Sequence, residues 1–307
     1  MIQNTQPGND NLRLAIPAIL IAVFALSLGD ALIKQESSAF PLWQIFIMRS
    51  VIATPFLVYF IRIRTCAISI MPTRFGWVAL RSIILAGMWV AYYLALPHVQ
   101  LSIAAASFYT LPLFITLFAA LLIGDQVGPI GWLAILLGFV GTLLILQPQA
   151  EDFNAYALLP IVSAICYALA MIMTRSKCQN ENPLVLSLWL NLTFIGVGVL
   201  AILIIQFLEP TLSSTAANPF LLGEWVPMWV DEWRAMTILA VAIIVGSVGA
   251  AIAYQSGPSS IIASFDFSYV PFAVVWGILL FGEVPDLTTI IGIVLIVCGG
   301  MLAVRNR

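Results

Sequence analysis

Ten long apolar segments run through this chain, and the last five repeat the pattern of the first five. Pro41 opens one segment and Arg49 follows it; about 142 positions later, Pro183 is followed at the same spacing by Asn191. Because five is odd, a unit of five membrane helices used twice must sit in the bilayer in opposite orientations. Inverted repeats of this kind are typical of alternating-access carriers. The pattern therefore predicts an all-α membrane protein of ten transmembrane helices, built as two inverted five-helix repeats, and favours a transporter.

A second pair of matching motifs lies later in each half. Residues 108–112 read Phe-Tyr-Thr-Leu-Pro and residues 267–271 read Phe-Ser-Tyr-Val-Pro. Pro112 and Pro271 each free a backbone carbonyl in the middle of a span, which is tolerable where that carbonyl faces other helices or a water-filled cavity. Prolines at matching places in the two halves predict hinges for gating.

A glycine and an acid end the same two spans, at Gly124-Asp125 and at Gly282-Glu283. Glycine suits a helix C-terminus. The acid would lie unfavourably beside the negative end of its own helix unless it bonds a neighbouring helix N-terminus. We interpret both pairs as structural caps at hinges rather than as binding sites.

Composition supports a membrane location. Of the 307 residues, 62% are hydrophobic and 8% are charged, and the mean hydropathy is +1.07, which is more apolar surface than a soluble fold needs. Segments of about 18 to 23 residues can cross about 30 Å of hydrocarbon as helices. We place the spans at 14–34, 42–61, 77–97, 101–123, 129–147, 155–174, 185–207, 235–255, 259–281 and 287–304. The first repeat then covers 14–147 and the second covers 155–304.

One long outer loop, 208–234, breaks the symmetry of the two repeats. It carries Trp225, Trp229 and Trp233 among prolines and acids. Indole rings with scattered acids suit the lipid headgroup layer, since one side of the ring is apolar and its N–H needs a polar partner. We favour a segment that lies on the membrane surface over a substrate lid.

Basic residues predict the orientation, because cytoplasmic connections carry an excess of them. With residues 1–13 as a cytoplasmic tail, that side collects Arg13, Arg62, Arg64, Arg74, Arg175, Lys177, Arg305 and Arg307. The opposite face collects the acids Glu36, Glu151, Asp152, Glu209, Glu224, Asp231, Glu232 and Asp286. We therefore expect both termini in the cytoplasm and a location in a bacterial inner membrane.

Nothing in the sequence supports catalysis. The four cysteines (Cys66, Cys166, Cys178 and Cys298) are scattered without metal-ligand spacing, so we expect free thiols and no metal. His98 is the single histidine, which leaves no Ser–His–Asp set. No phosphate-binding glycine loop is present, so we expect no cofactor and no ATP-driven step. A net charge of −2 gives no reason to expect a nucleic-acid partner.

Together the motifs resemble the drug/metabolite transporter superfamily, specifically its EamA-like ten-helix branch. The resemblance rests on the run Gly29 to Lys34, on Pro41, Arg49, Arg81, Pro112, Gly124-Asp125, Gly138 and Gly141, and on the runs 264–267 and 280–286. It extends from about residue 14 to residue 304 and looks closest to the subgroup of S-adenosylmethionine carriers. The resemblance implies a basket in which spans 1–4 and 6–9 line a central cavity, with spans 5 and 10 as peripheral braces.

Asp266 is the most informative charge inside a span, because inserting a charge costs about 2.5 to 3.5 kcal/mol and needs a reason. It precedes Pro271 on a stretch rich in aromatics. Its carboxylate can hold a cationic group or take up a proton. The structural alternative is an acid bonded to a helix end or to a hydroxyl such as Ser264 or Tyr269. We predict that Asp266 is the principal polar anchor of the cavity.

Three further charges lie near the outer ends of the first two spans. Asp30 and Lys34 stand four residues apart, a spacing that permits a salt bridge, and Arg49 can reach the depth of Asp30. These charges either staple spans one and two or form an outer gate that breaks on opening, and we favour the staple. Arg81 lies near the cytoplasmic end of span three, where its guanidinium can snorkel to the headgroups.

Aromatic residues are the candidate walls of the binding site: Trp89, Tyr92, Tyr93, Tyr109 and Tyr167. At helical spacing, aromatics are more often plain packing than a binding box, but aromatics beside a lone carboxylate attract organic cations. We therefore expect a small cationic or zwitterionic metabolite, such as an amino acid derivative, a quaternary amine or S-adenosylmethionine. Transport would be gradient-driven or by exchange, with a coupling proton or an exchanged solute as the second partner.

Two alternatives stay open. An anionic metabolite such as a carboxylate could be held by Arg49 or Lys34. A non-transporting scaffold or a channel is less favoured: the buried charges and the repeat argue against a scaffold, and the spans offer isolated polar points instead of the continuous polar pore of a channel.

Overall fold

The computed structural model describes residues 11–64, 69–118, 129–146, 154–208, 218–257, 262, 265–266 and 268–305, and every regular element in this part of the chain is helical. The first half contains α1 (Leu12–Glu36), α2 (Leu42–Arg64), α3 (Phe75–Ala95), α4 (Leu101–Phe108), α5 (Leu111–Phe118) and α6 (Pro129–Leu146). The second half contains η2 (Ala155–Leu158), α7 (Leu159–Ser176), α8 (Pro183–Leu208), α10 (Pro219–Leu222), α11 (Val230–Ser256), α13 (Tyr269–Phe281) and α14 (Leu287–Arg305). The expected all-helical class is confirmed.

Six helical segments in the described residues are long and apolar enough to cross a membrane, namely α1, α2, α3, η2 with α7, α8 and α11. They fall on six of the ten expected spans. Shorter apolar helices fall on the fourth, ninth and tenth expected spans, and α6 falls on the fifth. Helices of this length and composition make the chain an integral membrane protein.

The fourth and ninth expected spans differ from the continuous helices that the sequence suggested. The chain turns at Tyr109 and Thr110 between α4 and α5, and a turn at Ser268 precedes α13. Pro112 and Pro271 therefore lie in the first turn of a new helix, where the missing N–H of proline has no helical partner to lose. The expectation of a proline in mid-helix was wrong for this reason.

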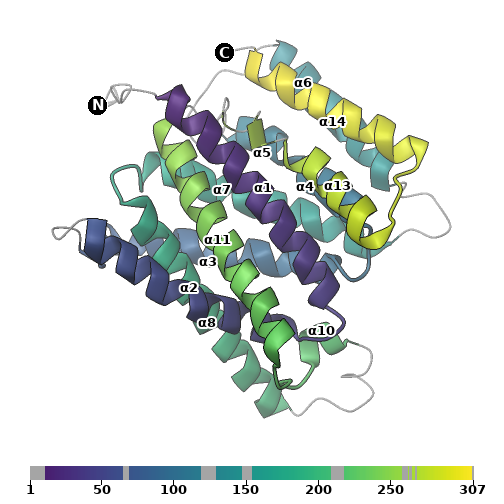
Figure 1. Ribbon diagram of the computed structural model, residues 1–307. Helices are drawn as coiled ribbons and strands as arrows, with labels where there is room; N and C mark the ends of the chain where they lie inside the picture. The colour runs from purple at the N-terminus through teal and green to yellow at the C-terminus, as the bar shows by residue number, and fades with distance from the viewer. Residues whose placement is uncertain are drawn as a thin grey trace.

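The helices pack chiefly in four pairs: α1 with α11, α3 with α7, α2 with α8, and α6 with α14. Figure 1 shows α1 and α11 side by side through the bundle and α6 with α14 at its edge. The α1–α11 pair is close because of Gly249: a Cβ there would lie 2.9 Å from the Ala18 carbonyl oxygen. Small residues permit this approach in membrane helices.

The start of α1 and the end of α14 lie at the same end of the bundle (Figure 1), which we call the N-terminal end. At this end Glu181, in the α7–α8 connection, accepts hydrogen bonds from the backbone N–H groups of Thr73 and Arg74 at 3.1 and 2.8 Å. The Gln255 side chain of α11 donates to the carbonyls of Cys178 and Glu181 at 2.8 and 2.9 Å. These contacts join α3, α7, α8 and α11 at the N-terminal end.

At the opposite end, which we call the far end, residues 218–229 lie across the first turn of α2. The Trp43 indole donates to the Leu221 carbonyl at 2.9 Å. Gln44 exchanges two hydrogen bonds with the Val226 backbone, at 2.6 and 2.9 Å. This part of the long connection is therefore tied to the bundle.

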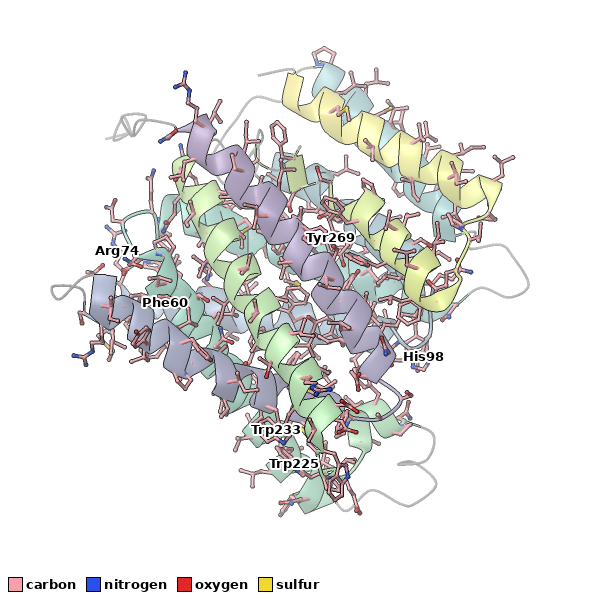
Figure 2. All side chains as sticks on the ribbon, viewed as in Figure 1. Phe60, Arg74, His98, Trp225, Trp233 and Tyr269 are labelled. Carbon is pink, nitrogen blue, oxygen red and sulfur yellow. The ribbon has the colours of Figure 1, made fainter. Side chains whose placement is uncertain are left out.

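Tryptophans of the same connection point away from the bundle. Trp225 and Trp229 are 52% and 75% exposed, and Figure 2 shows Trp225 and Trp233 at the far end. Exposed indoles suit the headgroup layer that the sequence suggested. Residues 209–217 of the connection lie outside the described part of the chain.

Candidate functional site

A small cavity lies inside the bundle and has a volume of about 20 Å³, room for one or two water molecules. Its walls come mainly from α1, α3, α4, α7 and the start of α13, and they are formed by Val23, Leu26, Asp30, Met88, Trp89, Tyr92, Phe108, Tyr109, Tyr167, Asp266 and Tyr269. Two of these side chains are acids and none is basic. Figure 2 shows Tyr269 in the middle of the bundle.

Asp266 lines the cavity and is 2% exposed. The hydroxyl of Tyr254, on α11, donates to its Oδ2 at 2.7 Å. The hydroxyls of Tyr109 and Tyr167 also lie near enough to interact with this carboxylate. Asp266 is therefore surrounded by three tyrosine hydroxyls. This environment resembles the structural alternative, in which the acid bonds a hydroxyl, but the hydroxyls differ from the Ser264 and Tyr269 that the sequence suggested.

Asp30 is the second acid of the cavity and is also 2% exposed. Its Oδ2 accepts a hydrogen bond from the Tyr269 hydroxyl, and the Tyr269 hydroxyl lies 2.9 Å from that of Tyr92. Its Oδ1 has no hydrogen-bond partner among the described residues. Asp30, which the sequence suggested only for a staple or gate, thus belongs to the cavity wall.

Most of the expected aromatic walls do face the cavity. Trp89, Tyr92, Tyr109 and Tyr167 line it, whereas Tyr93 is absent from its lining. Tyr93 instead packs against the Trp89 ring at a centroid distance of 5.0 Å and supports the wall from behind. Phe108 and Tyr269 also line the cavity; the sequence had suggested neither as a wall, and Tyr269 only as a hydroxyl partner for Asp266.

Arg49 is buried behind this wall. Its guanidinium lies 4.8 Å from the ring centres of Phe46 and Phe194 and 5.4 Å from that of Tyr93. Nη1 donates to the Tyr93 hydroxyl at 3.1 Å, while Nε and Nη2 have no partner in the described part of the chain. Ring faces therefore hold this cation, and it does not line the cavity.

Lys34 pairs with Glu283 and not with Asp30, so the suggested salt bridge within α1 is corrected. The Lys34 Nζ atom lies 2.6 Å from Glu283 Oε1 and 2.6 Å from the Val99 carbonyl oxygen. The long lysine side chain reaches past its own helix, because a carboxylate and a carbonyl both lie within range at the far end.

Glu283 also caps a neighbouring helix. Its Oε2 accepts a hydrogen bond at 2.8 Å from the N–H of Leu101, the first residue of α4. Gly282 ends α13 in the left-handed conformation, with a φ of 64°, which glycine adopts without steric cost. This is the arrangement expected for the Gly282-Glu283 pair; Gly124-Asp125 lies outside the described residues.

Arg81 does not snorkel to a headgroup layer. It is 2% exposed, and its Nε donates to the Thr174 hydroxyl of α7. Its side chain is turned towards α7 because that helix packs against α3 along its length. The interpretation of Arg81 as an interfacial cation was wrong.

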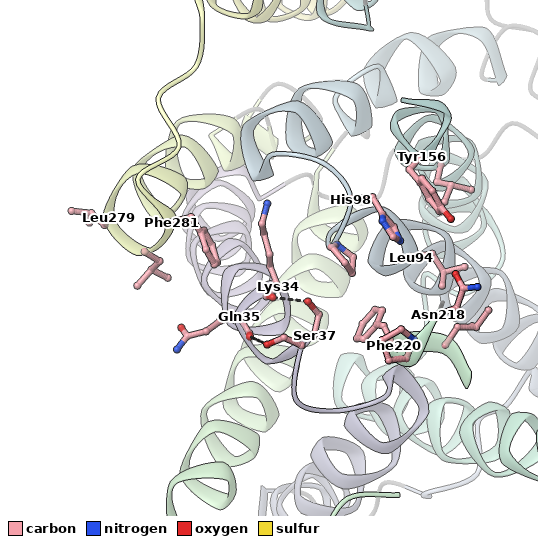
Figure 3. Close-up of a pocket in the computed structure, with 16 residues that line it drawn as sticks. Lys34, Gln35, Ser37, Leu94, His98, Tyr156, Asn218, Phe220, Leu279 and Phe281 are labelled. Atoms are coloured by element: carbon pink, nitrogen blue, oxygen red, sulfur yellow. Dashed lines mark hydrogen bonds between the residues drawn. The ribbon is translucent and has the colours of Figure 1, made fainter. Parts of the chain in front are cut away.

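A larger pocket of about 760 Å³ opens at the far end (Figure 3). Lys34, Leu94, His98, Phe220 and Phe281 are among its lining residues. The His98 and Tyr156 rings stack at 3.9 Å on one wall. α1, α3 and α13 therefore line both cavities, and the Lys34–Glu283 pair lies where these helices end.

Helices that can cross a membrane, packed around a small internal cavity that two carboxylates line, define an integral membrane protein. The model of the EamA-like transporter family matches residues 13–147 and again residues 154–305. The chain belongs to this family. Its relatives are named as transporters, so the protein is a transporter and not an enzyme.

Several known proteins are similar over most of the chain. The pseudopaline exporter CntI of Pseudomonas aeruginosa is 26% identical over 97% of this chain and 98% of its own. A riboflavin transporter of Rhizobium johnstonii is 29% identical over 80% and 76%. The S-adenosylmethionine uptake transporter of Rickettsia bellii is 23% identical over 94% of each. A protein of known crystal structure has the same fold, with a TM-score of 0.68 at 19% identity over 98% of this chain and 99% of that one.

Proposed function

We propose that this protein is a secondary active transporter of a small organic metabolite with a cationic or zwitterionic centre. The observation that carries the proposal is the lining of the central cavity, which contains two acids and no basic side chain. A buried carboxylate attracts a cation by direct charge, and tyrosine and tryptophan faces add a quadrupole attraction. The relatives carry different named substrates, so they support transport without selecting among substrates.

An anionic substrate is less well supported. Lys34 is already occupied by Glu283, and Arg49 lies behind the cavity wall. A channel is also less well supported, because the central cavity is small and polar contacts close the bundle towards both ends. At this volume the cavity has room for water but not for a metabolite, so the central site has to widen when a substrate binds.

Alternating access between two inverted repeats, 14–147 and 155–304, is part of the same proposal. In the two proposed repeats α1 corresponds to α7, and α3 corresponds to α11. Replacing each helix by its counterpart therefore converts the α1–α11 pair into the α7–α3 pair, and both are main packing pairs. The same exchange leaves α2–α8 and α6–α14 unchanged as pairs. The helix breaks before Pro112 and Pro271 also correspond, and discontinuous helices at matching places are typical of such carriers.

A thermal-shift screen of the purified protein tests the substrate class. A ligand that binds only the folded state at 100 times its Kd stabilises it by about 2.7 kcal/mol. We expect cationic and zwitterionic metabolites to raise the Tm. Stabilisation by anions alone would reject a cationic or zwitterionic substrate and would favour an anionic substrate held by Arg49.

We expect all ten helices to span a bacterial inner membrane, with the N-terminal end of the bundle in the cytoplasm. Native cysteines are poor reporters, because Cys178 is buried and Cys66 lies outside the described residues. Exposed positions serve better: in a cysteine-free background, S38C at the far end should react with an impermeant maleimide on intact cells, and R62C should react only after permeabilisation. Labelling of R62C from outside would reverse the orientation.

We expect the Lys34–Glu283 pair to act as the outer gate. E283Q and K34M should each raise the rate at which an impermeant thiol reagent labels M88C, a cavity position, from the far side by about tenfold. The reason is that a charge-assisted, mostly buried contact of about 1.5 kcal/mol holds the closed state, and loss of that amount shifts a two-state population about tenfold.

The matched control for the gate is R234Q, which breaks the exposed Arg234–Asp231 pair and should leave labelling unchanged. Unaltered labelling of M88C in both E283Q and K34M would show that the pair is a staple and not a gate.

A further inference from the structure

The two acids of the cavity differ in how far their hydrogen-bonding capacity is met. Asp266 has three tyrosine hydroxyls around it, from Tyr254, Tyr109 and Tyr167. Asp30 accepts a hydrogen bond at Oδ2 from Tyr269 and lies near enough to the Tyr93 hydroxyl to interact with it, but its buried Oδ1 has no partner in hydrogen-bonding geometry among the described residues. A buried acceptor left without a donor costs free energy, and more so when it is charged.

We propose that Asp30 makes the direct contact to the substrate, and that the group it contacts is a protonated amine with at least one N–H donor. The proposal rests on the function proposed above and narrows its substrate class. A primary or secondary ammonium can donate to the open Oδ1 of Asp30, whereas a quaternary amine has no hydrogen to donate. A charge-assisted hydrogen bond is about twice as strong as a neutral one, so the N–H group should be strongly preferred.

The surroundings of Asp30 suit this ligand. Trp89 and Tyr92 line the same cavity, and their ring faces attract the ammonium that Asp30 accepts from. Arg49 is near enough for its charge to act on Asp30, but it makes no hydrogen bond to the unpaired oxygen: its Nη1 donates to the Tyr93 hydroxyl, and its guanidinium lies on the faces of Phe46 and Phe194.

Asp266 has a different role on this geometry. It accepts a hydrogen bond from Tyr254 on α11, and it interacts with Tyr167 of α7 and with Tyr109 in the turn after α4. It is a positioning residue that fixes the tyrosine rings of the wall. The assignment reverses the ranking that the sequence suggested, in which Asp266 was the principal anchor.

A matched ligand series tests the inference. Ethanolamine, N-methylethanolamine, N,N-dimethylethanolamine and choline carry the same charge and hydroxyl but have successively fewer N–H donors. Their Kd values are measured on the purified full-length protein by thermal shift, for wild type, D30N and D266N. In wild type we expect affinity to fall about tenfold or more from ethanolamine to choline. In D30N we expect ethanolamine to bind about tenfold more weakly and the spread across the series to narrow.

D266N is the control for differences in hydration among the four ligands. Even if all four bind it more weakly, the ratio of their Kd values should stay as in the wild type. Equal Kd values of ethanolamine and choline for the wild type would overturn the N–H requirement. This comparison uses only the wild-type protein, so it does not depend on whether a variant folds. An unchanged spread in D30N, or the same narrowing in D266N, overturns the assignment to Asp30 while the proposed function stands. If no member of the series stabilises the wild type, the cationic class falls and this inference falls with it.

Discussion

The double variant D30N/D266N is expected to lose cation binding by about 100-fold or more. It keeps the shape of both side chains but removes both negative charges from a cavity that has no others in its lining. The charge-assisted contact to Asp30 contributes about 1.5 to 3 kcal/mol, the Asp266 charge adds a longer-range attraction for the cation, and each 1.4 kcal/mol corresponds to a factor of ten in Kd. The thermal-shift response to cations, and uptake into liposomes, should both disappear.

The control for this variant is D231N, which removes an acid whose side chain is 88% exposed. It should bind cations as the wild type does. A double variant that folds and still responds to cations would show that the cavity carboxylates do not select the charge of the substrate.

The variant G249L is expected to destabilise the protein by about 1 to 3 kcal/mol and to abolish transport. A Cβ at this position would lie 2.9 Å from the Ala18 carbonyl oxygen and 2.9 Å from the Ala22 Cβ atom. Overpacking at that distance forces the helices apart, and α1 carries Asp30 into the cavity. Thermal unfolding in detergent measures the loss of stability, and liposome uptake measures the loss of function.

Gly196 provides the matched control, because a Cβ there would meet nothing within 4 Å. G196L should leave the Tm unchanged or raise it slightly, since leucine is the better helix former. If G249L is as stable as G196L, the close α1–α11 packing is not needed for the fold.

The sequence predicted the positions of the helices well, because their apolar lengths are set by the thickness of the bilayer. It did not predict the breaks before Pro112 and Pro271. A proline is compatible both with a kink inside a helix and with the first turn of a new one, and only the packing of the turn decides between them.

Residue types alone could not assign the partners of the buried charges. Lys34 and Glu283 are 249 positions apart, whereas Asp30 is four positions away, so helical spacing pointed to the nearer acid. Tyr254 reaches Asp266 from another helix, with no local spacing to indicate it. Four of the five expected aromatic residues, Trp89, Tyr92, Tyr109 and Tyr167, line the cavity, and all four fall on spans that the family resemblance implied would surround it.

Counterflow in liposomes is the most direct test of carrier function. Liposomes containing the purified protein are loaded with an unlabelled cation that raises the Tm, and the labelled cation is added outside without nucleotide. A carrier of the proposed kind should accumulate the label transiently above its external concentration and should saturate as that concentration rises. Simple equilibration of the label, with a flux that rises linearly and never saturates, would contradict transport by alternating access.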